Sequence, residues 1–185
     1  MMARRELRLS AALLLVSLTG LNGAEAAREV SLGTPVIRQD AALTITAAYE
    51  PPLRVEGADP AEPSFFLPPD KADLFLTVDI RGGKGNKNGF GAGEFIPYLS
   101  VSYALQRQGS SQALQGQLRP LATPQGIRYG NNVKLTGPGI YSLTVTIEPP
   151  IKVGFGRHTD LETGVSRWWK PFQVEWPLKH PESTE

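Results

Sequence analysis

The sequence predicts an all-β protein, and more closely an immunoglobulin-like β-sandwich of about seven or more antiparallel strands. Apolar residues recur at every second position along most of the chain, which is the period of a strand. Gly and Pro clusters separate these runs, and no stretch beyond the N-terminal segment has a convincing helical period. Two sheets packed face to face need one apolar face on each strand, so we prefer the sandwich, with a closed barrel as the alternative.

Residues 1–26 have the pattern of a secretory signal peptide. Three arginines within the first eight positions precede a mostly apolar run over 9–21, and small residues follow at Ala24 and Ala26. This run is too short to span a bilayer, and we expect cleavage after Ala26. Residues 27–185 then form a single domain in the periplasm. Because the chain has no cysteine, we expect neither a lipid anchor on cysteine nor a disulfide.

The mature chain is electrically neutral. The signal carries three of the 19 basic and two of the 18 acidic residues, which leaves 16 of each in the mature chain. Nucleic-acid binders and proteins that dock on anionic membranes need concentrated positive charge, and no cationic run is present. We therefore expect no nucleic-acid partner and no polybasic membrane contact.

The clearest strands follow one another along the chain. Their apolar positions alternate over residues 43–49, 74–80, 99–105, 141–147 and 172–176. Each run ends near residues that supply positive φ or remove a ladder donor, namely Pro51-Pro52, Gly82-Gly83, Gly137-Pro138-Gly139 and Pro149-Pro150. These breaks make the connections turns and loops rather than helices.

Two loops contain candidate binding residues in addition to the residues that form their turns. The first covers 82–98, is rich in glycine and contains Glu94. Glycine permits close backbone approach, so this loop is able to cradle an anion or another chain. The alternative is a long glycine-rich hairpin, which we prefer because the spacing matches neither a P-loop nor a calcium loop.

The second loop covers 157–172 and contains His158, Asp160 and Glu162 at alternate positions. An extended backbone would direct the three side chains to one side, and imidazole with carboxylates suits Cu, Zn, Mn or Fe. The alternative is a surface histidine held by a hydrogen bond. Trp168 and Trp169 follow, and we expect one ring to cap the core and the other to cover it or to fill a subunit interface.

Four segments together resemble the periplasmic iron-transport protein family. They are GNKNGFGAGEFIPYL at 85–99, YGNNVKL at 129–135, IEPP at 147–150 and RHTDLETGVSRWWKPF at 157–172. The resemblance extends over about residues 32–178. It implies an immunoglobulin-like sandwich, a homodimer and a role in iron uptake beside an inner-membrane iron permease. It also implies copper bound at a Met/His/Glu site near the dimer interface.

The family's metal ligands are mostly replaced in this chain. His158 matches the family histidine of the RHTD segment, but Phe75 and Thr77 stand where the family has a histidine and a glutamate. Leu121 replaces a methionine, and Arg128 replaces another histidine. We therefore predict that the copper site is absent or badly weakened, and that Arg128 turns a cation site into an anion or carboxylate clamp.

Iron or copper is still a possible weakly held cofactor. The donors proposed for such a metal are His158, Asp160, Glu162 and Glu94, with Asp73 and Asp79 as further oxygen donors. Asp79 and Glu94 are better explained as ion-pair partners of Arg81, Lys84 or Arg128 across strands.

An enzymatic function is not indicated. The chain has no cysteine nucleophile and no G-x-S-x-G elbow, and its two histidines are His158 and His180. The alternative to iron uptake is a periplasmic binding or chaperone-like module that acts through protein contacts, by an exposed strand edge or by the tryptophan pair.

Overall fold

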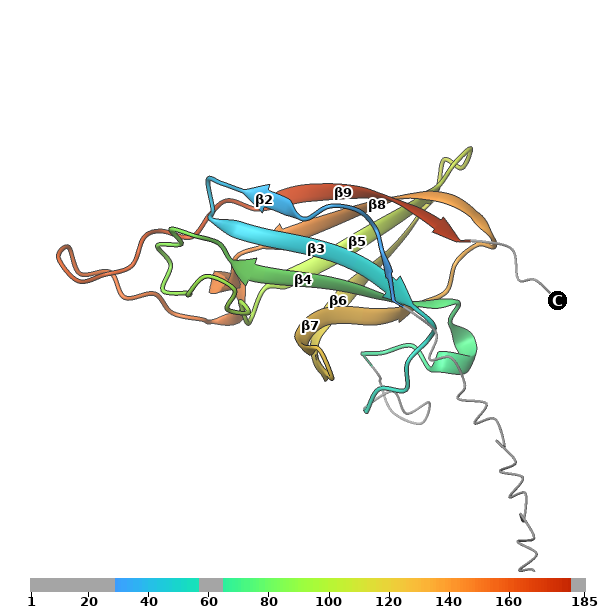
Figure 1. Ribbon diagram of the computed structural model, residues 1–185, viewed down its shortest axis with the longest axis horizontal. Coiled ribbons are helices and arrows are strands. Elements are labelled where there is room, and N and C mark those ends of the chain that lie inside the picture. The colour runs from blue at the N-terminus through green and yellow to red at the C-terminus, as the bar shows by residue number, and fades with distance from the viewer. Residues whose placement is uncertain (1–28, 57–64, 181–185) are drawn as a thin grey trace, which may run out of the picture.

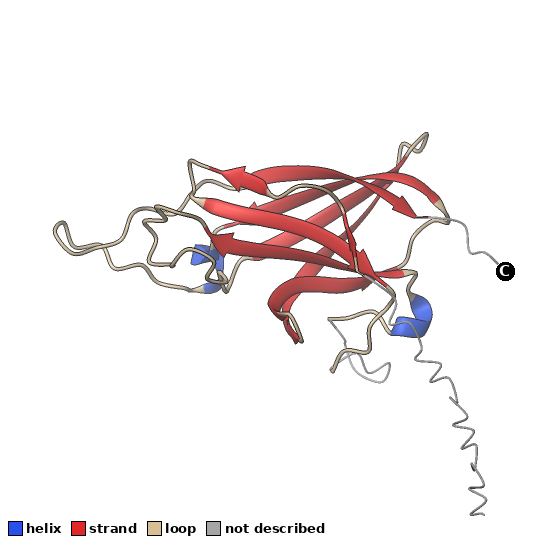
Figure 2. Cartoon of the chain, viewed as in Figure 1, coloured by secondary structure: helices blue, strands red, loops and turns tan. Residues whose placement is uncertain are grey.

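The computed structural model describes residues 29–56 and 65–180. The predicted signal peptide and its cleavage site lie outside these residues. Two short 3-10 turns, η1 (Pro69–Lys71) and η2 (Pro150–Val153), accompany nine strands (Figure 2). The strands are β1 (Val30–Ser31), β2 (Val36–Arg38), β3 (Leu43–Glu50), β4 (Leu74–Gly82), β5 (Ser100–Arg107), β6 (Ala113–Thr123), β7 (Gly126–Val133), β8 (Gly139–Glu148) and β9 (Phe172–His180). In this part of the chain, no helix is long and apolar enough to cross a membrane.

All the strands are antiparallel neighbours in one curled sheet whose two halves face each other (Figure 1). The order is β1-β3-β4-β7-β6-β5-β8-β9, with β2 also paired to β3. Strand β6 belongs to both halves, because residues 113–118 pair with β5 and residues 119–123 pair with β7. The predicted all-β sandwich is confirmed.

The two edges of the curled sheet approach each other without forming a ladder in the described part of the chain. The Tyr49 hydroxyl on β3 donates a hydrogen bond to the Lys179 carbonyl on β9, at 2.9 Å. The strand order nevertheless begins at β1 and ends at β9, so the barrel is not closed by backbone hydrogen bonds.

The core lies between the two halves and is filled by the predicted alternating residues. Ile45, Ile80, Leu143 and Ile147 are fully buried there. Tyr129 on β7 is also fully buried, and its hydroxyl accepts a hydrogen bond from the Leu99 N–H at 2.9 Å and donates one to the Ile96 carbonyl at 2.8 Å. Burial raises the pKa of this phenol, so it stays protonated at physiological pH.

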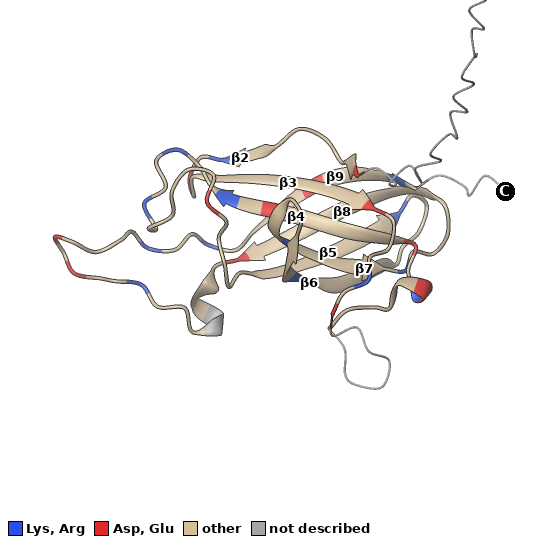
Figure 3. Ribbon diagram, turned by 60° about the horizontal axis from the view of Figure 1, so that its bottom comes forward, with Lys and Arg blue, Asp and Glu red and all other residues tan. Residues whose placement is uncertain are grey.

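The β6–β7 hairpin is not among the strands that alternation predicts. Its first strand is largely exposed and contains glutamines, an arginine, a glycine and a proline, so little apolar alternation is visible. This segment is a strand because its backbone pairs with β5 and β7, and not because one of its faces is buried. Charged residues of both signs are interleaved over the strands and loops (Figure 3).

Asp73 secures the end of the β4–β7 pair, so it serves a structural role. Its carboxylate accepts hydrogen bonds from the Lys134 ammonium at 2.7 Å and the Leu135 N–H at 2.6 Å. Partial burial acts most strongly on this group and opposes ionisation, but these bonds outweigh it and lower the pKa of Asp73.

We expect Asp73→Ala to lower the free energy of unfolding by about 1–3 kcal/mol at pH 7. A lowered folded-state pKa stabilises the protein fully above the unfolded pKa of Asp, about 3.9, and this stabilisation is lost as the pH falls through the folded-state value. The difference between the two proteins should therefore shrink below about pH 4. Urea unfolding from pH 7 to pH 3 measures it, and a difference that stays constant with pH would contradict this role.

Candidate functional site

The four positions predicted to have lost a metal ligand, Phe75, Thr77, Leu121 and Arg128, lie together on the outer face of β4, β6 and β7, which we call the Arg128 face. On β4, residues 74, 76 and 78 point into the core, so Phe75 and Thr77 point away from it. Thr77 pairs with Gly130 on β7, two residues from Arg128, and Arg128 pairs with Leu121 on β6. The fold therefore brings residues from three strands to one place.

Phe75 fills the end of this face nearest the start of β4. It is fully buried although it lies outside the main core cluster. A Cβ atom placed on Gly130 would come within 2.6 Å of the Phe75 ring, so the absence of a side chain at 130 makes room for the ring. Opposite Phe75, the side chain of Asn132 donates to the carbonyls of Leu53 and Leu67, which holds the segment after β3 over this face.

Thr77 is buried, and its hydroxyl donates to the Ala48 carbonyl on β3 at 3.2 Å. Beyond it on the same face, the Asp79 carboxylate forms an ion pair with Arg81, with 2.7 Å between Arg81 Nε and Asp79 Oδ2. Arg81 also donates to the Gly93 carbonyl at 3.0 Å. The predicted ion pair of Asp79 with Arg81 is present, but it forms within β4 and not across two strands.

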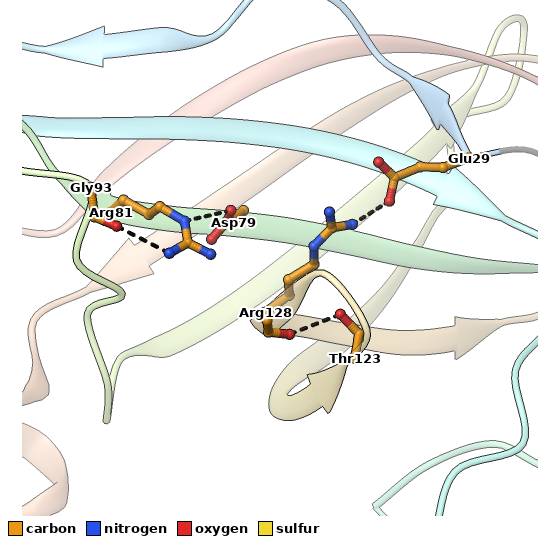
Figure 4. Close-up of polar contacts among 7 residues, drawn as sticks. Glu29, Asp79, Arg81, Gly93, Thr123 and Arg128 are labelled. Atoms are coloured by element: carbon orange, nitrogen blue, oxygen red, sulfur yellow. Dashed lines mark hydrogen bonds and ion pairs between the residues drawn. The ribbon is translucent and has the colours of Figure 1, made fainter.

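Arg128 extends across the face and forms an ion pair with Glu29, the residue just before β1 (Figure 4). The arginine side chain is only 14% exposed, whereas that of Glu29 is 39% exposed. Burial and then the negative charge of Glu29 raise the pKa of nearby Glu50, while Arg128 opposes this shift. A largely buried, positively charged guanidinium therefore lies on this face, paired with a carboxylate.

These side chains line a small polar cavity of about 220 Å³, which we call the Arg128 pocket. Its lining residues are Glu29, Ser31, Thr46, Ala47, Ala48, Thr77, Asp79 and Arg128. Glu29 was not predicted as a site residue. Its position three residues after the expected cleavage site gave no sign that β1 would add to β3 and bring it to β7.

The predicted metal loop forms a separate feature at one end of the molecule. It projects beyond the strands, well away from β7 (Figure 1). His158 Nε2 lies 2.9 Å from Asp160 Oδ2, and both side chains are more than half exposed. The loop turns back through the Gly164 and Val165 N–H groups, which donate to the carbonyls of Asp160 and His158.

The other two predicted donors do not complete a metal site with this pair. Glu162 lies exposed at the turn of the loop, and Glu94 accepts a hydrogen bond from the Gly91 N–H at 2.7 Å. Over residues 29–56 and 65–180, no three His, Asp or Glu side chains are grouped closely enough to hold a metal ion. Metal binding by His158, Asp160, Glu162 and Glu94 stays a prediction.

The tryptophan pair divides between core and loop. Trp169 is buried in the core, and Trp168 packs partly exposed against Phe90 and Phe155. The Asn88 amide donates to the carbonyls of Ser166 and Arg167, so the two long loops are tied together. This arrangement fits the expectation that one ring caps the core and the other covers it.

Comparison with known proteins gives a consistent set of relatives. A family model described as Fe2+ transport protein matches residues 26–181. A UPF0423 protein of Brucella abortus is 37% identical over 173 residues, which covers 91% of this chain and 90% of that protein.

Two solved structures extend the comparison to the fold. A copper-bound variant of FetP from uropathogenic Escherichia coli strain F11 is 43% identical, with a TM-score of 0.75, and the match covers 83% of this chain and 97% of FetP. Copper-reconstituted P19 from Campylobacter jejuni is 34% identical with a TM-score of 0.75, and the match covers 85% and 99% of the two chains.

Proposed function

The chain belongs to the Fe2+ transport protein family, and on that premise we propose that it is the periplasmic component of a bacterial iron-uptake system. It works with an inner-membrane iron permease and lacks the copper site of its copper-bound relatives. The family is one of metal transport rather than of catalysis, and FetP was recombinantly expressed in the periplasm of Escherichia coli. We also propose a homodimer, as the family resemblance implies.

The loss of the copper site is supported by the side chains that lie on the Arg128 face. Phenylalanine and leucine offer no lone pair, and the hydroxyl of Thr77 is neutral and already donates to Ala48. The Arg128 guanidinium carries a fixed positive charge and is paired with Glu29. These residues do not fit Cu(II), which favours imidazole nitrogen and carboxylate oxygen ligands, nor Cu(I), which favours imidazole and thioether ligands.

Without that site, the contribution to iron uptake rests on other donors or on contact with the permease. His158 and Asp160 already lie within hydrogen-bonding distance on an exposed loop, and Glu162 is close in sequence. Imidazole and carboxylate oxygens suit iron. The loop therefore supplies an accessible but weak metal contact that a partner could complete.

An uptake assay in cells tests this proposal. Radioactive iron accumulation is measured in cells that lack this protein, in cells that lack the inner-membrane iron permease proposed as its partner, in cells that lack both, and in each strain with the protein restored. We expect restored uptake only where the permease is present. Unchanged iron accumulation in all the strains would contradict a role in uptake and would favour a binding or chaperone-like module.

A further inference from the structure

The Arg128 pocket contains two buried polar atoms that nothing in the described structure satisfies. They are Asp79 Oδ1, a hydrogen-bond acceptor, and Arg128 Nε, a donor. The other oxygen of Asp79 is bonded to Arg81, and another nitrogen of Arg128 is bonded to Glu29. A buried polar group without a partner costs about 1–3 kcal/mol, so a pair of them lining one cavity points to a ligand.

The two free atoms specify what such a ligand must offer. Arginine presents Nε and its terminal nitrogens as a planar fork that matches the two oxygens of a carboxylate. Asp79 Oδ1 requires a donor, which a carboxylate alone cannot supply. In Figure 4 the Arg128 guanidinium lies between Asp79 and Glu29, so one small molecule in the pocket can reach both free atoms.

We propose that the Arg128 pocket binds small α-hydroxycarboxylates. The ligand carboxylate displaces Glu29 and binds the edge of the Arg128 guanidinium that includes Nε, and the ligand hydroxyl donates to Asp79 Oδ1. The cavity of about 220 Å³ has room for roughly seven water-sized groups at about 30 Å³ each, which is enough for glycolate or lactate.

The exchange is electrostatically balanced. An incoming carboxylate replaces an outgoing one, so the charge beside Arg128, Asp79 and Arg81 does not change. Glu29 is the more exposed partner and precedes a strand of only two residues, so its release disturbs few backbone bonds. A simple carboxylate would instead place its charge near Asp79 without the compensating hydroxyl donor, and it should bind less well.

The biological meaning of this inference rests on the proposed function, because α-hydroxycarboxylates also chelate ferric iron through their oxygens. An iron-uptake component that holds such a molecule would recognise the organic part of an iron chelate rather than the bare ion. The pocket itself is defined by hydrogen bonding and requires no metal.

Isothermal titration of the mature protein with glycolate, and with acetate as the matched ligand that lacks the hydroxyl, tests the proposal. We expect glycolate to bind at least about tenfold more tightly than acetate, which corresponds to about 1.4 kcal/mol. Glu29→Gln should tighten glycolate binding by about tenfold, because the internal competitor loses its charge. Arg128→Gln should abolish binding, and Asp79→Asn should remove the preference for glycolate.

Glu175→Gln is the matched control, since it removes one exposed carboxylate from β9 and should leave both affinities unchanged. Circular dichroism of each variant verifies folding, and Glu29→Ala replaces Glu29→Gln if the latter is misfolded. Equal affinity for the two ligands, undiminished binding by folded Arg128→Gln, or no binding by the parent and Glu29→Gln would overturn the proposal. These outcomes leave the iron-uptake assay unaffected, whereas unchanged iron accumulation with intact glycolate binding would overturn the proposed function alone.

Discussion

A variant carrying Phe75→His, Thr77→Glu, Leu121→Met and Arg128→His should bind Cu(II) on the order of 100-fold or more tightly than the parent chain. The four positions already lie on one face of three paired strands, so the replaced side chains need no change of backbone to converge. The substitutions remove the guanidinium charge and supply two imidazoles, a carboxylate and a thioether. Calorimetric titration, with electron paramagnetic resonance of the bound Cu(II), measures both affinity and ligand type.

The control for this experiment is the same variant with Arg128 retained. A guanidinium beside the other three donors should repel the cation and keep the affinity close to that of the parent. If the four-substitution variant folds but binds Cu(II) no better than the parent chain, the residue matching that places the family's ligands at these positions is wrong.

Gly130→Ala should destabilise the protein by about 1–3 kcal/mol, because the added methyl group meets the Phe75 ring. The Cβ atom would lie 2.6 Å from the ring and 3.1 Å from the Leu76 carbonyl oxygen, and the fully buried ring has little space to move away. Chemical denaturation of the parent and the variant measures the difference in unfolding free energy.

The cause can be isolated with Phe75→Leu, which removes the ring atoms that clash. In this background Gly130→Ala should cost much less, and the double-mutant cycle should give a coupling on the order of 1 kcal/mol or more. Additive effects of the two substitutions would show that the ring does not determine the need for glycine at 130.

The fold was largely predictable because burial imposes a period of two on most strands. Ile45, Ile80 and Leu143 follow that period and are fully buried. The β6–β7 hairpin was missed, since β6 is held by pairing with β5 along its first half and with β7 along its second half, and it exposes most of its side chains. The local spacing of apolar residues indicates which side chains are buried, but it does not indicate which strands, far apart in the sequence, pair with each other.

The candidate site was only partly predictable for the same reason. Matching to the family located Phe75, Thr77, Leu121 and Arg128, and the strand register brings them together. The partner of Arg128 is separated from it by 99 residues, and only the addition of β1 to β3 places Glu29 beside it. No spacing rule in a sequence contains that information.

Titration of the metal-stripped mature protein with Cu(II), beside His158→Ala, tests the central claim that the scaffold persists while the copper site does not. We predict only weak binding, carried by the exposed loop and reduced in His158→Ala, with no change when Thr77 or Arg128 is replaced by alanine. Tight Cu(II) binding by the parent chain that is lost in Thr77→Ala would contradict the claim, because it would place a working copper site on the Arg128 face.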